Sequence, residues 1–343
     1  MTDLDPLPTV RLADGGALAA GLPHLLGFRP EESLVVVSLR GQEPRTVGLT
    51  ARVDLPPPEH GGSLARDLAR SVLTDHPTAV ALLVVSEDDD GADLPHRMLL
   101  REAVLAFRAH QVPVRDALLV RRGRWWSYDC PHPCCAPDAG TPLSAGTSVL
   151  AAASVVGGTV VEAGRAALTA RIAATGSAGM PRACDEVGDE LAARTAELGW
   201  GAVAEQAWAA LLAAVDDAGT ARAARLSDRQ VARLAWGLRD ADLRDRALTL
   251  ALGESAPGAE VVWTELTRRA PAPLDAAPAT LLAVSAWLRG DGALANVALD
   301  RALDSEPGYT LAGLLRTALD ACLPPAVVRQ VIREAGGPLD ADR

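Results

Sequence analysis

The spacing of apolar residues predicts four strands in the first part of the chain. Residues 34–39 form a continuous apolar run of strand length, which is typical of a strand buried on both faces. Apolar and polar residues alternate over residues 45–55, as expected of a half-exposed strand that pairs antiparallel with the first. Two more apolar runs, residues 79–85 and 114–120, predict further buried strands.

Helical patterns separate these strands. Leu64, Leu68 and Val72 would share one face of a helix, and residues 94–110 predict a second helix. The order is strand, strand, helix, strand, helix, strand, with a final hairpin into residues 125–128, and it indicates an α/β domain with a mixed sheet. Two antiparallel strands ahead of βαβα units also occur in ribonuclease-H-like folds, which is an analogy of element order alone.

The strand patterns stop near residue 148, and apolar positions then follow helical spacing, which predicts an all-α domain. Ser227 and Gln230 have the spacing of a capping box, so we expect a helix to begin after Ser227. We place the boundary between residues 143 and 144. Residues 1–143 are then the α/β domain, which ends in a cysteine-rich loop, and residues 144–343 are the helical domain.

Part of the helical region resembles a tetratricopeptide repeat. The residues that carry this likeness are Trp287, Gly290, Asp291, Ala295, Leu299, Ala302, Leu303 and Pro307. They cover about one repeat, so the resemblance implies a single helical hairpin. One interpretation of the chain is therefore a helical scaffold for a protein partner, with an exposed apolar groove around Trp287 and Leu294.

The composition favours a folded protein and argues against some classes of binding partner. Of 343 residues, 49% are hydrophobic, and no window reaches the roughly 18 uninterrupted apolar residues of a membrane span. The first residues lack the basic segment of a signal peptide, so we expect a cytoplasmic protein without a membrane partner. The net charge of −11 opposes nucleic-acid binding. We expect the one cationic cluster, Arg121, Arg122 and Arg124, to be a solvated hairpin tip.

Four candidate metal ligands lie within six residues of one another in the cysteine-rich loop: Cys130, His132, Cys134 and Cys135. Thiolate sulfur and imidazole nitrogen are ligands that zinc prefers. The spacing is not that of a zinc finger, so a metal would take two or three ligands here. Pairing of Cys130 with Cys134 or Cys135 in a redox disulfide is a second interpretation, and a reduced structural cluster is a third.

Carboxylates offer another candidate site. The run from Ser86 to Asp90, which contains Glu87 and Asp88, directly follows the buried strand at residues 79–85, and Asp54 ends the alternating strand. If the three converge, they could hold magnesium for phosphoester hydrolysis. The other interpretation is a solvated acidic loop. No nucleophile elbow or phosphate loop is present, so the sequence leaves open whether the protein is an enzyme.

Polar residues also lie between the first helix and the first strand. Arg29, Glu31 and Glu32 would occupy a loop, where ligand-binding residues often concentrate. A turn held together by ion pairs would have the same composition.

The chain as a whole resembles the actinobacterial family catalogued as domain of unknown function 4192. The likeness is carried by residues 25–37, 52–56 and 126–130, by Cys134 and Cys135, and by residues 287–295. The resemblance implies no activity. We therefore expect a binding or regulatory protein whose cysteine-rich loop lies near the junction of the two domains, with the hydrolase and the helical scaffold as alternatives.

Overall fold

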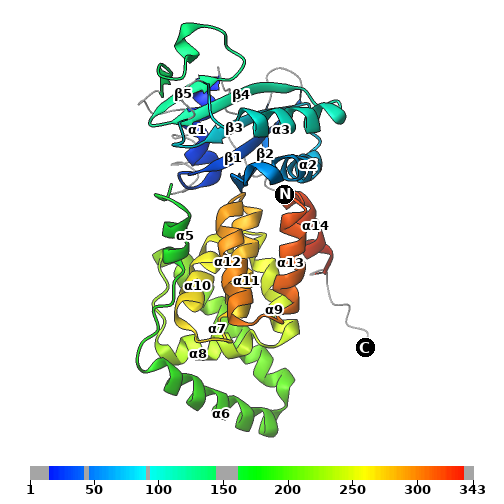
Figure 1. The fold of residues 1–343 in the computed structure, drawn as a ribbon. Coiled ribbons are helices and arrows are strands. Elements are labelled where there is room, and N and C mark those ends of the chain that lie inside the picture. The colour runs from blue at the N-terminus through cyan, green and yellow to red at the C-terminus, as the bar shows by residue number, and fades with distance from the viewer. Residues whose placement is uncertain (1–14, 42–45, 90–92, 144–160, 336–343) are drawn as a thin grey trace. The chain divides into compact units, whose positions relative to one another are not determined.

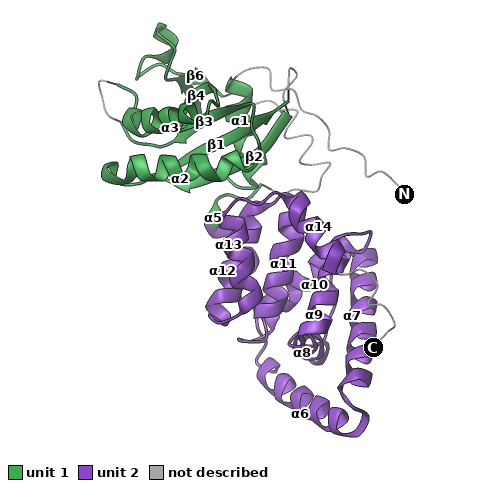
Figure 2. Cartoon of the chain, turned by 90° about the vertical axis from the view of Figure 1, so that its right-hand side faces the viewer, with its two compact units in different colours: residues 1–165 green, residues 166–343 purple. Residues whose placement is uncertain are grey.

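The structure is a computed structural model that describes residues 15–41, 46–89, 93–143 and 161–335. The chain divides into two compact units, residues 1–165 (unit 1) and 166–343 (unit 2), which Figure 2 colours separately. The domain boundary predicted between residues 143 and 144 adjoins residues 144–160, which lie outside the described ranges, so it stays a prediction.

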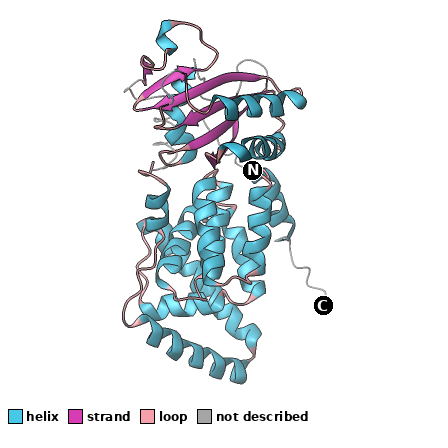
Figure 3. Cartoon of the chain, viewed as in Figure 1, coloured by secondary structure: helices cyan, strands magenta, loops and turns pink. Residues whose placement is uncertain are grey.

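Unit 1 is built around one mixed sheet, as the apolar pattern predicts (Figures 1 and 3). Its strands are β1 (Ser33–Arg40), β2 (Thr46–Asp54), β3 (Ala79–Val85), β4 (Val114–Arg121), β5 (Arg124–Ser127) and β6 (Thr141–Pro142). They lie in the order β2-β1-β3-β4-β5-β6. β3 and β4 pair in parallel, and every other neighbouring pair is antiparallel. Two antiparallel strands do precede the helix and strand units, and the ribonuclease-H analogy extends no further than that.

Helices cover both faces of this sheet. They are α1 (Gly15–Leu26), α2 (Gly61–Leu73) and α3 (Arg97–Ala109). The core lies between the sheet and the pair α2 and α3, where Phe107 and Val72 are fully buried against strand residues such as Leu82. α1 packs on the opposite face, against β4 and β5. Strand β1 is buried from Ser33 to Leu39, because both of its faces are covered.

The strand directions bring several loops to one edge of the sheet. Ser33, the first residue of β1, pairs with Asp54 at the end of β2 and with Val85 at the end of β3. Val85 in turn pairs with Val120 near the end of β4. The carboxyl ends of β2, β3 and β4 therefore share an edge with the segment that enters β1. We call this edge the carboxyl edge.

In unit 2, the described residues contain helices and no strand. The helices are α5 (Arg165–Arg171), α6 (Met180–Leu198), α7 (Trp200–Ala221), α8 (Asp228–Gly237), α9 (Ala241–Leu248), α10 (Ala256–Arg269), α11 (Ala276–Leu288), α12 (Gly292–Ser305), α13 (Thr310–Asp320) and α14 (Pro325–Ala335). The capping box predicted at the start of α8 is present, since Ser227 and Gln230 cap each other's backbone. None of the helices in the described ranges combines the length and the apolar character that crossing a bilayer requires.

α11 forms the centre of unit 2, and all of its residues are buried. It packs against α10 and α12, and Asp291 caps the start of α12 by accepting a hydrogen bond from the Leu294 backbone. The prediction of an exposed groove around Trp287 and Leu294 is wrong, because these residues are only 4% and 0% exposed. The tetratricopeptide likeness and the role as a protein scaffold stay predictions.

Candidate functional site

The cysteine-rich loop follows β5 and is anchored to the sheet by aromatic side chains. Trp126 and Tyr128 are buried in the core between the sheet and α3. The Trp126 indole Nε1 donates to the Ala136 carbonyl oxygen at 2.9 Å. The Tyr128 hydroxyl donates to the Pro95 carbonyl oxygen at 2.5 Å, just before α3. Cys134 and Cys135 lie in a short 3₁₀ turn, Pro133–Cys135, between these anchors.

Three thiols of the loop come together. The Sγ atoms of Cys130, Cys134 and Cys135 all lie within 4.8 Å of one another, and those of Cys130 and Cys134 are 3.9 Å apart. All three cysteines are free. His132 adds no side-chain ligand to this group, but its backbone N–H donates to the Cys130 sulfur. The predicted ligands thus separate into three sulfurs and a histidine that acts through its backbone. We call the three thiols the thiol cluster.

The thiols differ in their acidity. The hydrogen bond from the His132 backbone lowers the pKa of Cys130 below its ordinary value, because it stabilises the thiolate. Burial raises the pKa of Cys135 to about 11, against a smaller opposing effect of the Ser127 backbone N–H, which lies 3.3 Å from its sulfur. Cys134 is exposed. The cluster therefore combines a thiol that ionises more readily than usual with one that resists ionisation.

This sulfur arrangement suits a soft metal ion. Zinc–sulfur bonds of about 2.3 Å at tetrahedral angles separate two sulfurs by about 3.8 Å, and the Cys130 and Cys134 sulfurs are 3.9 Å apart. A disulfide would need them to approach to about 2.05 Å. Three sulfurs also leave one tetrahedral position for an exchangeable ligand, as in zinc sites that are not closed by four protein ligands.

A second cluster lies at the carboxyl edge and contains Glu32, Asp88 and His96. Glu32 directly precedes β1, Asp88 lies in the loop after β3, and His96 directly precedes α3. One ligand atom from each lies within 4.8 Å of the other two. We call these three residues the edge cluster. In the part of the chain that the structure describes, it and the thiol cluster are the two groups of at least three such ligands at this spacing.

Ser86 connects the members of the edge cluster. Its side chain is 1% exposed, and its hydroxyl donates to Glu32 Oε2 at 2.8 Å. Ser86 Oγ also lies 3.1 Å from His96 Nε2 and accepts a hydrogen bond from the Asp88 backbone N–H at 3.1 Å. His96 Nε2 is also 3.3 Å from Asp88 Oδ2. Serine and aspartate thus contact the same imidazole nitrogen, which differs from a catalytic triad, where they contact opposite ring nitrogens.

The three carboxylates expected to converge share the carboxyl edge, but they have different partners. Asp54 pairs with Arg52 at 2.6 Å, and Glu87 pairs with Arg122 at 3.1 Å. Asp88 alone joins the edge cluster. These contacts therefore do not bring Asp54, Glu87 and Asp88 together as the expected magnesium ligands.

The loop ahead of β1 contributes one of its three candidate residues. Glu32 joins the edge cluster, and it also accepts a hydrogen bond from the Glu87 backbone at 2.7 Å. Arg29 and Glu31 act through their backbones: the Arg29 N–H donates to Glu162, and the Glu31 carbonyl accepts from Arg52 at 3.1 Å. The turn is thus held by hydrogen bonds from both backbone and side-chain groups.

Sequence reasoning missed His96 and Ser86. Ser86 is the first residue after β3, a position where ligand residues are common in α/β sheets, and this signal could have found it. His96 lies beyond the acidic loop at the start of a helix, and its position against Ser86 depends on how α3 packs. No local pattern indicates that contact.

Arg121 connects the two loops that carry these clusters. Its guanidinium donates to the Asp88 carbonyl at 2.8 Å and to the Pro137 carbonyl at 2.7 Å. It lies 4.9 Å from the centre of the Trp126 ring, in a cation–π contact. The side chain is only 6% exposed, so the expectation of a solvated tip is wrong for Arg121, because carbonyls and an indole replace its water.

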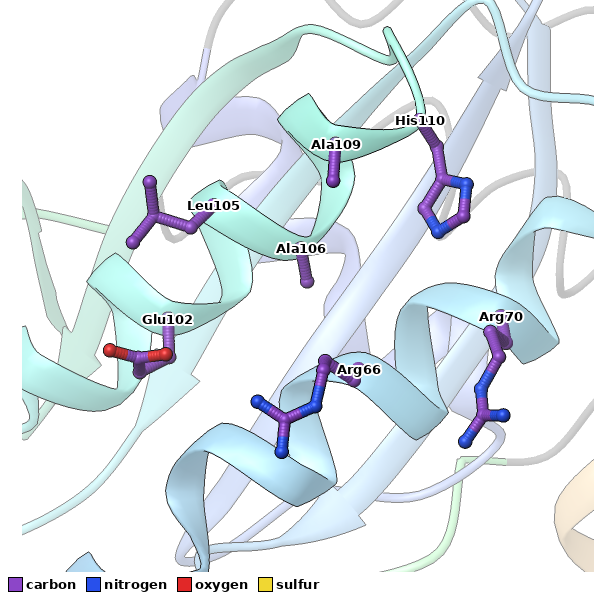
Figure 4. Close-up of a pocket in the computed structure, with 7 residues that line it drawn as sticks. All are labelled: Arg66, Arg70, Glu102, Leu105, Ala106, Ala109 and His110. Atoms are coloured by element: carbon purple, nitrogen blue, oxygen red, sulfur yellow. The ribbon is translucent and has the colours of Figure 1, made fainter.

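A separate groove runs between α2 and α3 (Figure 4). Arg66 and Arg70 of α2 line it on one side, and the α3 side includes Glu102 and Leu105. His110 lies at its end, directly after α3. The lining mixes both charges with apolar atoms and contains none of the residues of either cluster, so we assign it no ligand.

Comparison with known proteins identifies a family whose model covers most of the chain. The model of the family described as "Domain of unknown function (DUF4192)" matches residues 16–326, and this range includes both clusters and most of unit 2. No curated protein and no solved structure matches the chain.

Proposed function

The chain belongs to the DUF4192 family, and from that premise we propose that it is a binding or regulatory protein whose thiol cluster binds a zinc ion. The single observation that carries this proposal is the convergence of the Cys130, Cys134 and Cys135 sulfurs within 4.8 Å. Two thiols without the third could form a disulfide as readily as they could bind a metal. A third sulfur at the same spacing supplies a third metal ligand, whereas in a redox pair it would be a resolving thiol.

The acidity of the thiols supports the same function. Cys130 ionises more readily than an ordinary cysteine, so it would be the first ligand to engage the cation. Cys135 has a pKa of about 11, so it ionises near neutral pH only when a nearby positive charge stabilises its thiolate. Zinc supplies that charge. Zinc binding would therefore release protons and become tighter as pH rises.

The open fourth position supports a regulatory rather than a purely structural role. A closed site with four protein ligands holds zinc permanently, whereas three ligands leave room for water or for an incoming group. The function also requires reduced thiols, which assigns the protein to a reducing compartment such as the cytoplasm.

The test is the zinc content of the full chain, purified without chelators and measured by elemental analysis. We expect close to one zinc per chain. Cys134→Ser should lower zinc retention at least tenfold under dialysis against a competing chelator, because it removes one of three ligands. Cys322→Ser is the matched control, since Cys322 lies in unit 2 outside the cluster, and it should retain zinc like the unmodified protein.

Two results would contradict the proposal. One is a protein without zinc whose cluster thiols react freely with a thiol reagent, which would leave a structural cluster. The other is a protein whose mass is lower by two hydrogens and in which two of the three cluster thiols become reactive only after reduction. That result would support the redox pair.

A further inference from the structure

We propose that the edge cluster is a second cation site, in which Glu32, Asp88 and His96 bind a divalent ion of the manganese type. This inference does not rest on zinc binding by the thiol cluster. Its residues come from the entry to β1, the loop after β3 and the start of α3, so the fold rather than the local sequence brings them together.

The donor spacing fits an octahedral ion. Metal–ligand bonds of about 2.1 Å at right angles separate neighbouring donors by about 3.0 Å. Glu32 Oε2 is 2.8 Å from Ser86 Oγ, which is 3.1 Å from His96 Nε2, and that nitrogen is 3.3 Å from Asp88 Oδ2. The three ligands and the Ser86 hydroxyl that joins two of them therefore lie close enough to surround one ion, at distances that their hydrogen bonds also satisfy.

The local charge also favours a cation. The ligand atoms of two carboxylates lie within 4.8 Å of each other, and an ion between them would relieve their repulsion. The neighbouring arginines are engaged elsewhere. Arg122 pairs with Glu87, Arg97 pairs with Asp93, and Arg121 donates to two carbonyls. Among the described residues, no arginine forms an ion pair with Glu32 or Asp88, so these carboxylates are available to a bound ion.

The donor types separate this site from the thiol cluster. Carboxylate and hydroxyl oxygens with one imidazole suit manganese, whereas thiolates select softer ions such as zinc. Buried Ser86 would position the ligands, since its hydroxyl contacts both Glu32 and His96. The two clusters would therefore hold different metals at the same time.

The probe is Mn²⁺ itself, added to the zinc-loaded full chain and followed by the loss of the free-ion signal in electron paramagnetic resonance. We expect one bound Mn²⁺ per chain and at least tenfold weaker binding in Asp88→Asn and in His96→Gln. Asp54→Asn is the matched control: Asp54 lies at the same edge but pairs with Arg52, so its replacement should leave Mn²⁺ affinity unchanged.

A second measurement distinguishes a loss of Mn²⁺ binding from a failure of the variant to fold. Mn²⁺ should raise the melting temperature of the unmodified protein and of Asp54→Asn, because an ion that binds only the folded state stabilises it. It should leave the melting temperature of folded Asp88→Asn unchanged. No Mn²⁺ uptake at millimolar concentration, or uptake that both edge-cluster variants retain, would overturn the proposal.

The two metal proposals fail independently. Cys134→Ser should lose zinc and keep Mn²⁺, and His96→Gln should lose Mn²⁺ and keep zinc. If either substitution removed both metals while the protein stayed folded, the second site as proposed here would be wrong.

Discussion

At the scale of single residues, the environment gives identical side chains different chemistry. Cys130 and Cys135 lie five positions apart in one loop, yet a backbone hydrogen bond is the main influence on the first and partial burial is the main influence on the second. The first environment stabilises a thiolate and the second destabilises it. Their order of ionisation is therefore fixed by the fold of the loop.

This difference predicts the pH dependence of alkylation in the metal-free protein. A lowered pKa means that the Cys130 thiolate is present at lower pH than that of an ordinary cysteine. Cys135, with a pKa of about 11, should remain a thiol until strongly alkaline pH. Iodoacetamide labelling, followed by fragmentation mass spectrometry between pH 6 and pH 9, should modify Cys130 first throughout. Buried Cys184 serves as a slow reference, and faster labelling of Cys135 would refute the assignment.

The residues of the two clusters also differ in how far the sequence predicts them. The three cysteines lie within six residues, so their proximity follows from the chain itself. His96 and Glu32 are separated by 64 positions, from 32 to 96, and only the packing of α3 on the sheet brings them together. Arg121 illustrates the same limit, because its burial depends on carbonyls of two separate loops.

At the scale of elements, apolar periodicity predicted the strands but not all of their directions. The continuous run in β1 and the alternation in β2 predicted an antiparallel pair, which the structure confirms. Whether Asp54 would share an edge with Glu87 was open, because that depends on the pairing of β1 with β3. The antiparallel pairing places both residues at the carboxyl edge, although their side chains have separate partners.

Helix packing in unit 2 depends on a glycine. A Cβ atom at Gly258, in the first turn of α10, would lie 2.3 Å from the Val215 carbonyl oxygen of α7. A backbone oxygen has little freedom to move, so α7 and α10 can approach this closely only when position 258 lacks a side chain. The helical spacing of the sequence predicts α10, but it does not indicate this contact.

We therefore expect Gly258→Ala to lower the free energy of unfolding by about 1–3 kcal/mol, the usual cost of overpacking. Gly313→Ala is the matched control, because Gly313 lies within α13 and a Cβ there meets no atom within 4 Å. That substitution should raise stability by about 0.5–1 kcal/mol through helix propensity. Urea unfolding of both variants measures the difference, and equal effects would refute the close contact.

At the scale of the whole molecule, the sequence predicted a sheet-containing part followed by a helical part, and the structure confirms this division of fold class. The groove expected around Trp287 is absent at α11, because the residues of this described helix are apolar or small on every side and are all buried. Such a helix is expected to be buried all round. The apolar and small residues from Ala276 to Leu288 therefore predict a helix buried inside unit 2, whereas the repeat-like spacing alone does not indicate this burial.

Each unit has its own core, so a ligand of the thiol cluster should act mainly within unit 1. Hydrogen–deuterium exchange of the full chain, with and without zinc, is the measurement. We expect zinc to slow exchange at least tenfold in residues 127–140, and to a smaller extent in residues 86–89, which Arg121 ties to the same loop. Residues 276–288 of unit 2 should not change.

Cys134→Ser provides the control for this experiment, because zinc should have no effect on its exchange. A uniform slowing across both units would show that the two cores unfold together. A change confined to the cysteine-rich loop would show that Arg121 transmits nothing to the acidic loop.

The packing of Trp126 should make its fluorescence sensitive to the state of the thiol cluster. Its indole lies beneath the Arg121 guanidinium and is hydrogen-bonded to Ala136, next to the sulfur ligands. Excited indole is sensitive to both a stacked cation and a bond at its ring nitrogen. The colour and brightness of its emission should therefore change when an ion reaches the neighbouring thiols, so binding can be followed in unlabelled protein.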